Sequence, residues 1–155
     1  MKKSVLTALI LMISVLSVQA KPNETDVRKF FDNYVNAVNT YQPNIFTKYY
    51  IPNATIYRVV EKKDGTTEQV KVPMSIYQNE SKKGETLAKI VKYTNNYTNI
   101  QVKTYDKDFR IDAIRKPSMG GSFPAYFIIG EDSQGNLKIK TESMNTPRQE
   151  FLQKQ

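Results

Sequence analysis

The feature that most constrains the fold is a change of period along the chain. Between residues 25 and 40, apolar side chains recur every three or four residues, which is the period of one helical face. From residue 54 the apolar and β-branched side chains alternate instead, which is typical of strands. A helix followed by several strands predicts an α+β domain, in which the helical stripe is buried. The stripe consists of Val27, Phe30, Phe31, Tyr34, Val35 and Val38.

Shorter elements follow this first helix. Apolar side chains between Ile45 and Tyr50 predict a short helix, which Pro52 ends because proline cannot continue a helix. Residues 54–61 and 67–72 are separated by a turn signal at 63–66, so they predict a β-hairpin.

The second half of the chain is read mainly as sheet. Met74 to Tyr93 predicts two helical pieces separated at Gly84. Residues 97–116 are extended, but their apolar positions change from even to odd numbers, which requires a bulge or a tight turn near 105–108. The remaining expectations are a central strand at 125–130, another strand at 137–143 and a frayed tail at 147–155.

The first twenty residues have the pattern of an export signal. Lys2 and Lys3 precede an apolar run from Ser4 to Leu16, and Val18-Gln19-Ala20 places small residues at a cleavage site. We therefore expect a signal peptide at 1–20 and a single mature domain at 21–155. The short, lysine-led leader is typical of bacteria, so we expect the protein to be periplasmic or secreted. No later apolar run reaches the length of a membrane span.

Composition excludes several kinds of chemistry. The chain has no cysteine and no histidine, so disulfides, thiolate sites, the commonest zinc ligand and the usual proton shuttle at neutral pH are all absent. No glycine-rich phosphate loop occurs. We therefore expect neither a metal nor a cofactor. The formal net charge is +8, but the lysines are scattered as on an ordinary soluble surface, which does not indicate a nucleic-acid partner.

Tyrosine and aspartate are the candidate functional residues. The chain has ten tyrosines, and tyrosine suits a pocket wall because its ring packs as apolar surface while its hydroxyl meets a ligand. Most carboxylates fall at turns or on the polar side of a strand. Asp112 alternates with Arg110 on the side opposite Phe109 and Ile111, so the pair would lie inside a pocket if that side is concave.

The order of elements, together with residues 44–56, resembles the nuclear transport factor 2-like (SnoaL-like) superfamily. Members carry an apolar short helix, an aromatic residue, a Pro-Asp/Asn-Ala turn and a β-branched strand, as in the stretch from Tyr49 to Thr55. The resemblance implies a cone: a curved antiparallel sheet packed on the N-terminal helix and two to three short helices, with a cavity between them. Such cavities serve isomerases, dehydratases and polyketide cyclases, and equally non-catalytic binding.

Three functions are consistent with an exported bacterial member of this superfamily. The favoured one is a non-catalytic binding domain whose cavity holds a small amphipathic ligand or a segment of a partner. The second is an isomerase or cyclase with Asp112 as general base and a tyrosine hydroxyl as oxyanion donor. The third is an envelope interaction or inhibitor module. The residues expected to line the cavity are Phe31, Tyr34, Tyr50, Tyr57 and Tyr126.

A homodimer through the outer face of the sheet is common in the superfamily. Here Lys138, Lys140 and Glu142 are expected to share one side of the last strand. That would make the face polar, so the oligomeric state is left open.

Overall fold

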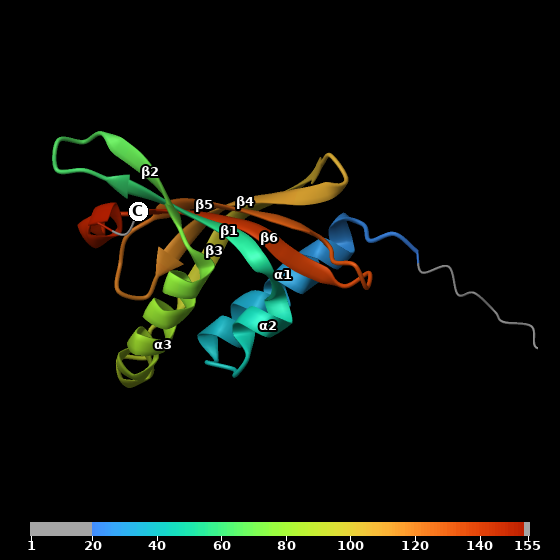
Figure 1. The fold of residues 1–155 in the computed structure, drawn as a ribbon, viewed down its shortest axis with the longest axis horizontal. Helices are drawn as coiled ribbons and strands as arrows, with labels where there is room; N and C mark the ends of the chain where they lie inside the picture. The colour runs from blue at the N-terminus through green and yellow to red at the C-terminus, as the bar shows by residue number, and fades with distance from the viewer. Residues whose placement is uncertain (1–19, 154–155) are drawn as a thin grey trace, which may run out of the picture.

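The molecule is a curved sheet with three helices against one face (Figure 1). The computed structural model describes residues 20–153, so the expected leader, apart from Ala20, lies outside the described residues. The helices are α1 (Glu24–Asn39), α2 (Ile45–Tyr49), α3 (Met74–Ile90) and a short 3-10 helix, η1 (Gln149–Gln153). The strands are β1 (Tyr50–Glu61), β2 (Thr67–Val72), β3 (Asn95–Tyr105), β4 (Asp108–Pro117), β5 (Phe123–Glu131) and β6 (Leu137–Thr146).

Helix α1 begins with a capping box and buries the predicted stripe. The Asn23 side chain accepts a hydrogen bond from the Asp26 backbone N–H, and the Asp26 carboxylate accepts one from the Asn23 backbone N–H. This satisfies donors that a helix start leaves without partners. Val27 and Phe31 are fully buried and Tyr34 is nearly so, which confirms the expected helix and the face it presents to the sheet.

The six strands lie in the order β2-β1-β6-β5-β4-β3. The curved sheet packed on helices is as expected, but the sheet is mixed because β1 and β6 run parallel. The expectation of a wholly antiparallel sheet is wrong at this pair. The two strands are far apart in sequence, and the route of the intervening chain, rather than a turn between them, sets their relative direction.

Interruptions of strand pairing allow the sheet to curve. In β3 an extra residue lies between Thr98 and Gln101, where Asn99 adopts a positive φ of 53°. In β1 the pairing with β6 skips from Tyr50 to Thr55, across Pro52, which has no backbone N–H to donate. Each bulge increases local twist and bends its strand.

Two expectations about the second half are corrected and one is confirmed. Helix α3 runs without a break through Gly84, because one glycine weakens a helix by only about 1 kcal/mol and no proline interrupts it. The tail expected to fray forms η1, and its Phe151 is buried. The expected reversal at 105–108 is a tight turn between β3 and β4, with Asp106 at a φ of 54°. Within residues 20–153, no helix has the length and apolar character to cross a membrane.

Candidate functional site

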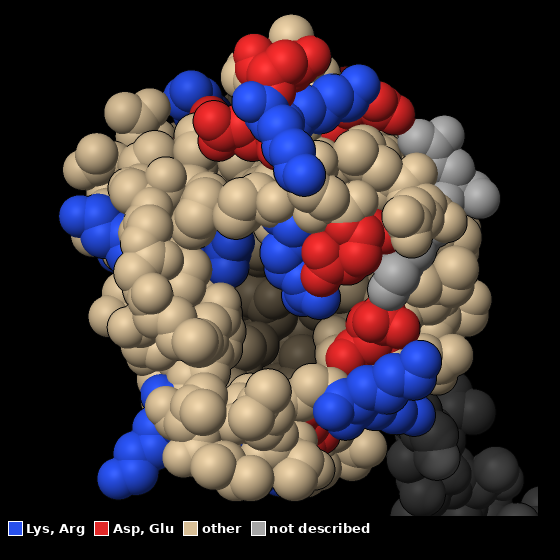
Figure 2. Space-filling view, turned by 90° about the vertical axis from the view of Figure 1, so that its left-hand side faces the viewer, with Lys and Arg blue, Asp and Glu red and all other residues tan. Residues whose placement is uncertain are grey.

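A cavity of about 980 Å³ lies between the three helices and the concave face of the sheet. Figure 2 shows the molecule hollowed on one side, with Lys and Arg side chains on the wall of the hollow. The volume exceeds the roughly 300 Å³ below which pockets rarely hold a small molecule. Apolar side chains from α1, α2, the β4–β5 loop and the sheet form much of the wall: Val35, Val38, Ile45, Phe46, Met119, Phe123 and Met144.

At the inner wall, a fully buried carboxylate collects hydrogen bonds from several elements. Glu142 Oε1 accepts from Arg58 Nη2 at 2.7 Å and from Tyr77 Oη at 3.0 Å. Glu142 Oε2 accepts from the Tyr50 hydroxyl and, at 3.5 Å, from that of Tyr34. The Tyr34 and Tyr50 hydroxyls are also 2.7 Å apart. We call these five residues the Glu142 cluster.

A bulge in β6 determines that Glu142 faces the cavity side. Ile128 and Ile129 of β5 are consecutive, but their partners in β6 are Thr141 and Ile139, so Lys140 is an extra residue. Before this bulge, odd-numbered Ile139 points inward; after it, the inward positions are even. Glu142 therefore lies beside Phe127, and its exposed fraction is 0%.

The electrostatics of the cluster keep its hydroxyls protonated. Burial, and next the negative charge of Glu142, raise the pKa values of Tyr34, Tyr50 and Tyr77. Burial by itself would lower the pKa of Arg58, but the charge of Glu142 and the hydrogen bond to it prevail, so the pKa of Arg58 is raised. The guanidinium also lies 4.8 Å from the centre of the Tyr77 ring. Arg58 and Glu142 thus form an ion pair whose charges cancel and whose position is fixed by hydrogen bonds.

The Glu142 carboxylate itself is closed off from a ligand in the cavity. Both oxygens of Glu142 already accept hydrogen bonds, and the side chain has no exposed surface, so a ligand in the cavity meets Arg58 and the tyrosines instead. Within residues 20–153, no group of three acidic, histidine or cysteine side chains is placed to hold a metal ion. The cavity therefore offers apolar surface, hydroxyl groups and positive charge.

The structure brings only some of the predicted pocket residues together. Tyr34 and Tyr50 line the cavity and belong to the cluster. Phe31 lies in the core below, 4.9 Å from Phe127 between ring centres. Tyr57 and Tyr126 lie on the opposite, convex side of the sheet, because the side chains that point into the concave side belong to their immediate neighbours in sequence.

The predicted polar pair of Asp112 and Arg110 forms, but outside the cavity. Asp112 is paired in the sheet with Tyr126 and shares its convex side. Its carboxylate accepts from Arg110 at 2.8 Å and from Lys103 at 2.9 Å. Burial is the largest single effect on the pKa of Asp112 and raises it, but the hydrogen bonds and charges of Arg110 and Lys103 together outweigh it, so the pKa is lowered. Asp112 therefore has neither the position nor the environment of a general base for a ligand in this cavity.

Sequence reasoning missed three members of the cluster. Glu142 was assigned to a polar outer face with Lys138 and Lys140, which the bulge at Lys140 makes wrong. Arg58 stands at an inward position of β1, between buried Ile56 and Val60, and this alternation was the available signal for a functional arginine. Tyr77 lies on α3, which buries no side chain completely. An apolar stripe along that helix therefore did not distinguish Tyr77 from the other tyrosines.

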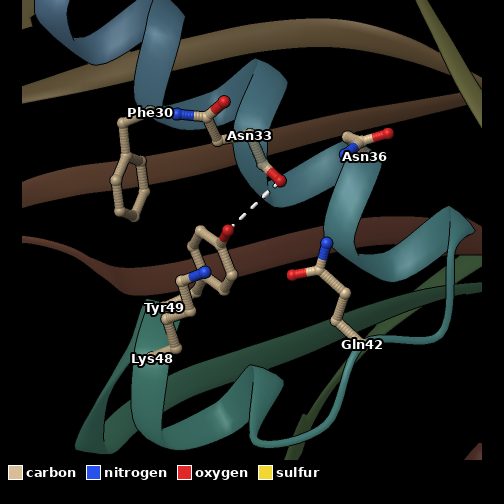
Figure 3. A pocket seen from close by; sticks show the side chains of 6 residues that line it. All are labelled: Phe30, Asn33, Asn36, Gln42, Lys48 and Tyr49. Carbon is tan, nitrogen blue, oxygen red and sulfur yellow. Dashed lines mark hydrogen bonds between the residues drawn. The ribbon is translucent and has the colours of Figure 1, made fainter.

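A second hollow, of about 450 Å³, lies between α1 and α2 (Figure 3). The Tyr49 hydroxyl donates to the backbone oxygen of Asn33 at 3.2 Å and closes its inner side. The side chains of Asn33, Asn36, Gln42 and Lys48 are exposed to solvent. It is a shallow polar groove without a buried charged group, so the larger cavity is the candidate site.

Solved structures share this architecture. An NTF2-like protein from Cytophaga hutchinsonii ATCC 33406 has a TM-score of 0.58 at 10% identity, with 81% of this chain and 99% of that chain covered. The CaMKII hub of S. rosetta has a TM-score of 0.55 at 13% identity, covering 82% and 98%. A protein from Catenulispora acidiphila in complex with S-DNPA has a TM-score of 0.53 at 11% identity, covering 78% and 90%. No family model matches the sequence, and neither does any curated protein.

Proposed function

Because the chain has the NTF2-like fold, as its sequence resemblance predicted, we propose that it is a non-catalytic binding domain for a small amphipathic molecule. The observation that carries the proposal is the cavity of about 980 Å³, whose wall is apolar over α1 and α2 and polar at the Glu142 cluster. Pockets for small molecules combine such apolar walls with a few fixed polar groups. A structural relative in complex with S-DNPA supports the idea that this fold can hold a small molecule.

The absence of catalysis is part of the proposal. The carboxylates that line the cavity are Glu80 and Glu85, both on α3. Glu80 pairs with Lys83 at 3.3 Å, and Glu85 pairs with Lys89. Both lie in water-accessible positions, whereas a general base needs a dry site that shifts its pKa toward the working pH.

We further propose that the protein works outside the cytoplasm, in the periplasm or the medium. The support is the pattern of residues 1–20: two lysines, an apolar run and a small-residue cleavage site. The ligand would then be a molecule of the envelope or the surroundings.

Fluorescence of N-phenyl-1-naphthylamine, a neutral apolar probe, tests the binding function. We expect a saturable increase in emission with the native protein. Val38→Trp replaces an isopropyl group on the cavity wall with an indole ring and should weaken probe binding about tenfold, because overpacking costs about 1–3 kcal/mol.

The matched control is Val91→Trp, since Val91 is exposed at the end of α3 and does not line the cavity. It should bind the probe as the native protein does. No saturable binding by the native protein, or equal affinities for Val38→Trp and the native protein, would rule out the cavity as the binding site.

A further inference from the structure

Positive charge predominates on the cavity wall. Of the charged side chains that line it, five are basic and two are acidic. Figure 2 shows Lys and Arg side chains on the wall of the hollow. The basic residues are Arg58, Lys82, Lys83, Arg115 and Arg148, and the acidic ones are Glu80 and Glu85.

Carboxylates of the protein neutralise three of these cations. Arg58 pairs with buried Glu142 at 2.7 Å. Lys83 pairs with Glu80, and the Nε atom of Arg148 lies 2.6 Å from the carboxylate of Glu150. Within residues 20–153, no carboxylate lies within 4.0 Å of the charged groups of Lys82 and Arg115. Lys82 is exposed on α3, whereas Arg115 is half-buried on the concave side of β4.

Neutral oxygen atoms hold the Arg115 guanidinium in place. Its Nη1 donates to the Tyr93 hydroxyl at 3.2 Å and to Asn95 Oδ1 at 3.1 Å. Its Nη2 donates to the backbone oxygen of Asn145 at 3.4 Å. These contacts fix the group without reducing its charge, so Arg115 presents an oriented cation to the cavity.

The unused donors of Arg115 match a carboxylate. Its Nε–H is buried and has no acceptor among the described residues, and Nη2 has a second hydrogen. These two N–H groups lie along one edge of the planar guanidinium and can bind both oxygens of one carboxylate. Because Nε has no exposed surface, the side chain would have to turn slightly for a ligand to reach this edge. The buried donor would then gain the partner that it lacks.

Apolar side chains surround this cation. The Phe123 ring centre lies 5.2 Å from the Arg115 guanidinium carbon, and Met119 and Met144 line the same cavity. An anion that binds Arg115 would therefore have apolar surface around the rest of its structure. Low-dielectric surroundings strengthen the attraction between the two charges.

We propose that the ligand of this cavity is an amphipathic carboxylate, whose acidic group pairs with Arg115 while its apolar part covers the surrounding wall. The inference rests on the proposed binding function. It goes further by assigning the charge of the ligand and the residue that recognises it.

Displacement of N-phenyl-1-naphthylamine by two ligands of equal chain length tests the inference. At pH 8, dodecanoate should displace the probe from the native protein at concentrations at least about tenfold lower than 1-dodecanol, because a charge-assisted hydrogen bond adds that much affinity. Arg115→Met should abolish this preference, and Arg115→Lys should keep most of it. Arg110→Met, on the convex side of the sheet, is the matched control and should keep it fully.

The outcomes separate this inference from the proposed function. Equal displacement by dodecanoate and 1-dodecanol would overturn the charge assignment and leave the binding function intact. A full preference in Arg115→Met would exclude Arg115 as the recognising residue. Failure of the probe and both ligands to bind would instead contradict the binding function itself. Because the native comparison needs no variant, the test holds even if Arg115→Met does not fold.

Discussion

Glu142 and Arg58 are charged residues buried in a small domain, at 0% and 6% exposed. Isolated charges are costly to bury, and the two side chains tolerate burial only because each has the other as partner. Three tyrosine hydroxyls complete the shell around the carboxylate. At the scale of residues, each member of the ion pair therefore depends on the other for its burial, and Arg58 also lines the cavity.

A double-mutant cycle measures this dependence. Glu142→Gln leaves the Arg58 charge buried without a counter-charge, and Arg58→Met does the same to Glu142, so each should lower the free energy of unfolding by about 3–5 kcal/mol. The double variant should lose clearly less than the sum, with a coupling of about 2 kcal/mol or more. Urea unfolding followed by circular dichroism gives all three values.

The control cycle uses the convex ion pair of Arg110 and Asp112. Their side chains are 35% and 30% exposed, so Arg110→Met and Asp112→Asn should each cost under about 1 kcal/mol. Additive effects at Arg58 and Glu142 would show that the pair does not act as a unit.

At the scale of elements, the extra residue in β6 decides which side chains enter the cavity. Without the bulge at Lys140, strict alternation would place Glu142 and Met144 on the convex side. The Lys140 side chain itself pairs with the Asp108 carboxylate at the start of β4, at 2.8 Å. Gly130 leaves room for this pair, because a Cβ there would overlap the carboxylate.

Deletion of Lys140 should therefore prevent folding, whereas Lys140→Ala should not. The deletion turns Glu142 outward and directs Ser143 inward, which removes the Glu142 cluster and leaves Arg58 without its partner. Lys140→Ala keeps the bulged backbone and loses only the partly buried ion pair, at about 1 kcal/mol. Circular dichroism and urea unfolding distinguish the two, and equal stability of both variants would contradict this role of the bulge.

At the scale of the whole molecule, one carboxylate connects every layer. Tyr34 comes from α1, Tyr50 from the start of β1 directly after α2, and Tyr77 from α3, and all three reach Glu142 on β6. The cluster therefore ties α1, α3 and the junction of α2 with β1 to β6 at the inner wall of the cavity. Its tyrosines should make the stability of the molecule sensitive to alkaline pH.

The pH dependence has a definite sign. The pKa values of Tyr34, Tyr50, Tyr77 and Tyr97 are raised above their usual value, chiefly by burial. Below pH 10 these tyrosines are protonated in both states, but above it they ionise first in the unfolded chain, so stability falls as pH rises. Each contributes a slope of up to about 1.4 kcal/mol per pH unit.

Urea unfolding between about pH 9 and about pH 11.5 measures this slope. Tyr77→Phe should reduce it by the share of one tyrosine, while also lowering stability at neutral pH through the lost hydrogen bond to Glu142. Tyr105→Phe is the control, because the Tyr105 side chain is exposed. A stability that stays constant through this range would contradict the burial of these hydroxyls.

Sequence reasoning succeeded where local pattern decides the outcome. The period of α1, the hairpin of β1 and β2, and the turn at 105–108 all follow from neighbouring residues. It wrongly predicted a helix break at Gly84, where one glycine weakens the helix only a little. It also predicted an antiparallel sheet, because the parallel pairing of β1 with β6 joins segments that are distant in sequence. Of the residues predicted to line a pocket, Tyr34 of α1 and Tyr50 at the start of β1 line the large cavity, and the local pattern places both.

The sequence by itself determined the elements and the α+β class, because helical and strand periods are written into consecutive side chains. The tertiary structure decided which charges are buried. After a bulge of one residue, every later side chain of the strand points to the opposite side of the sheet. The pairing of β5 with β6 determines where that bulge lies. Glu142 is thus the buried centre of the cluster behind the cavity wall and Asp112 lies at the outer surface, although both are acidic residues in strands.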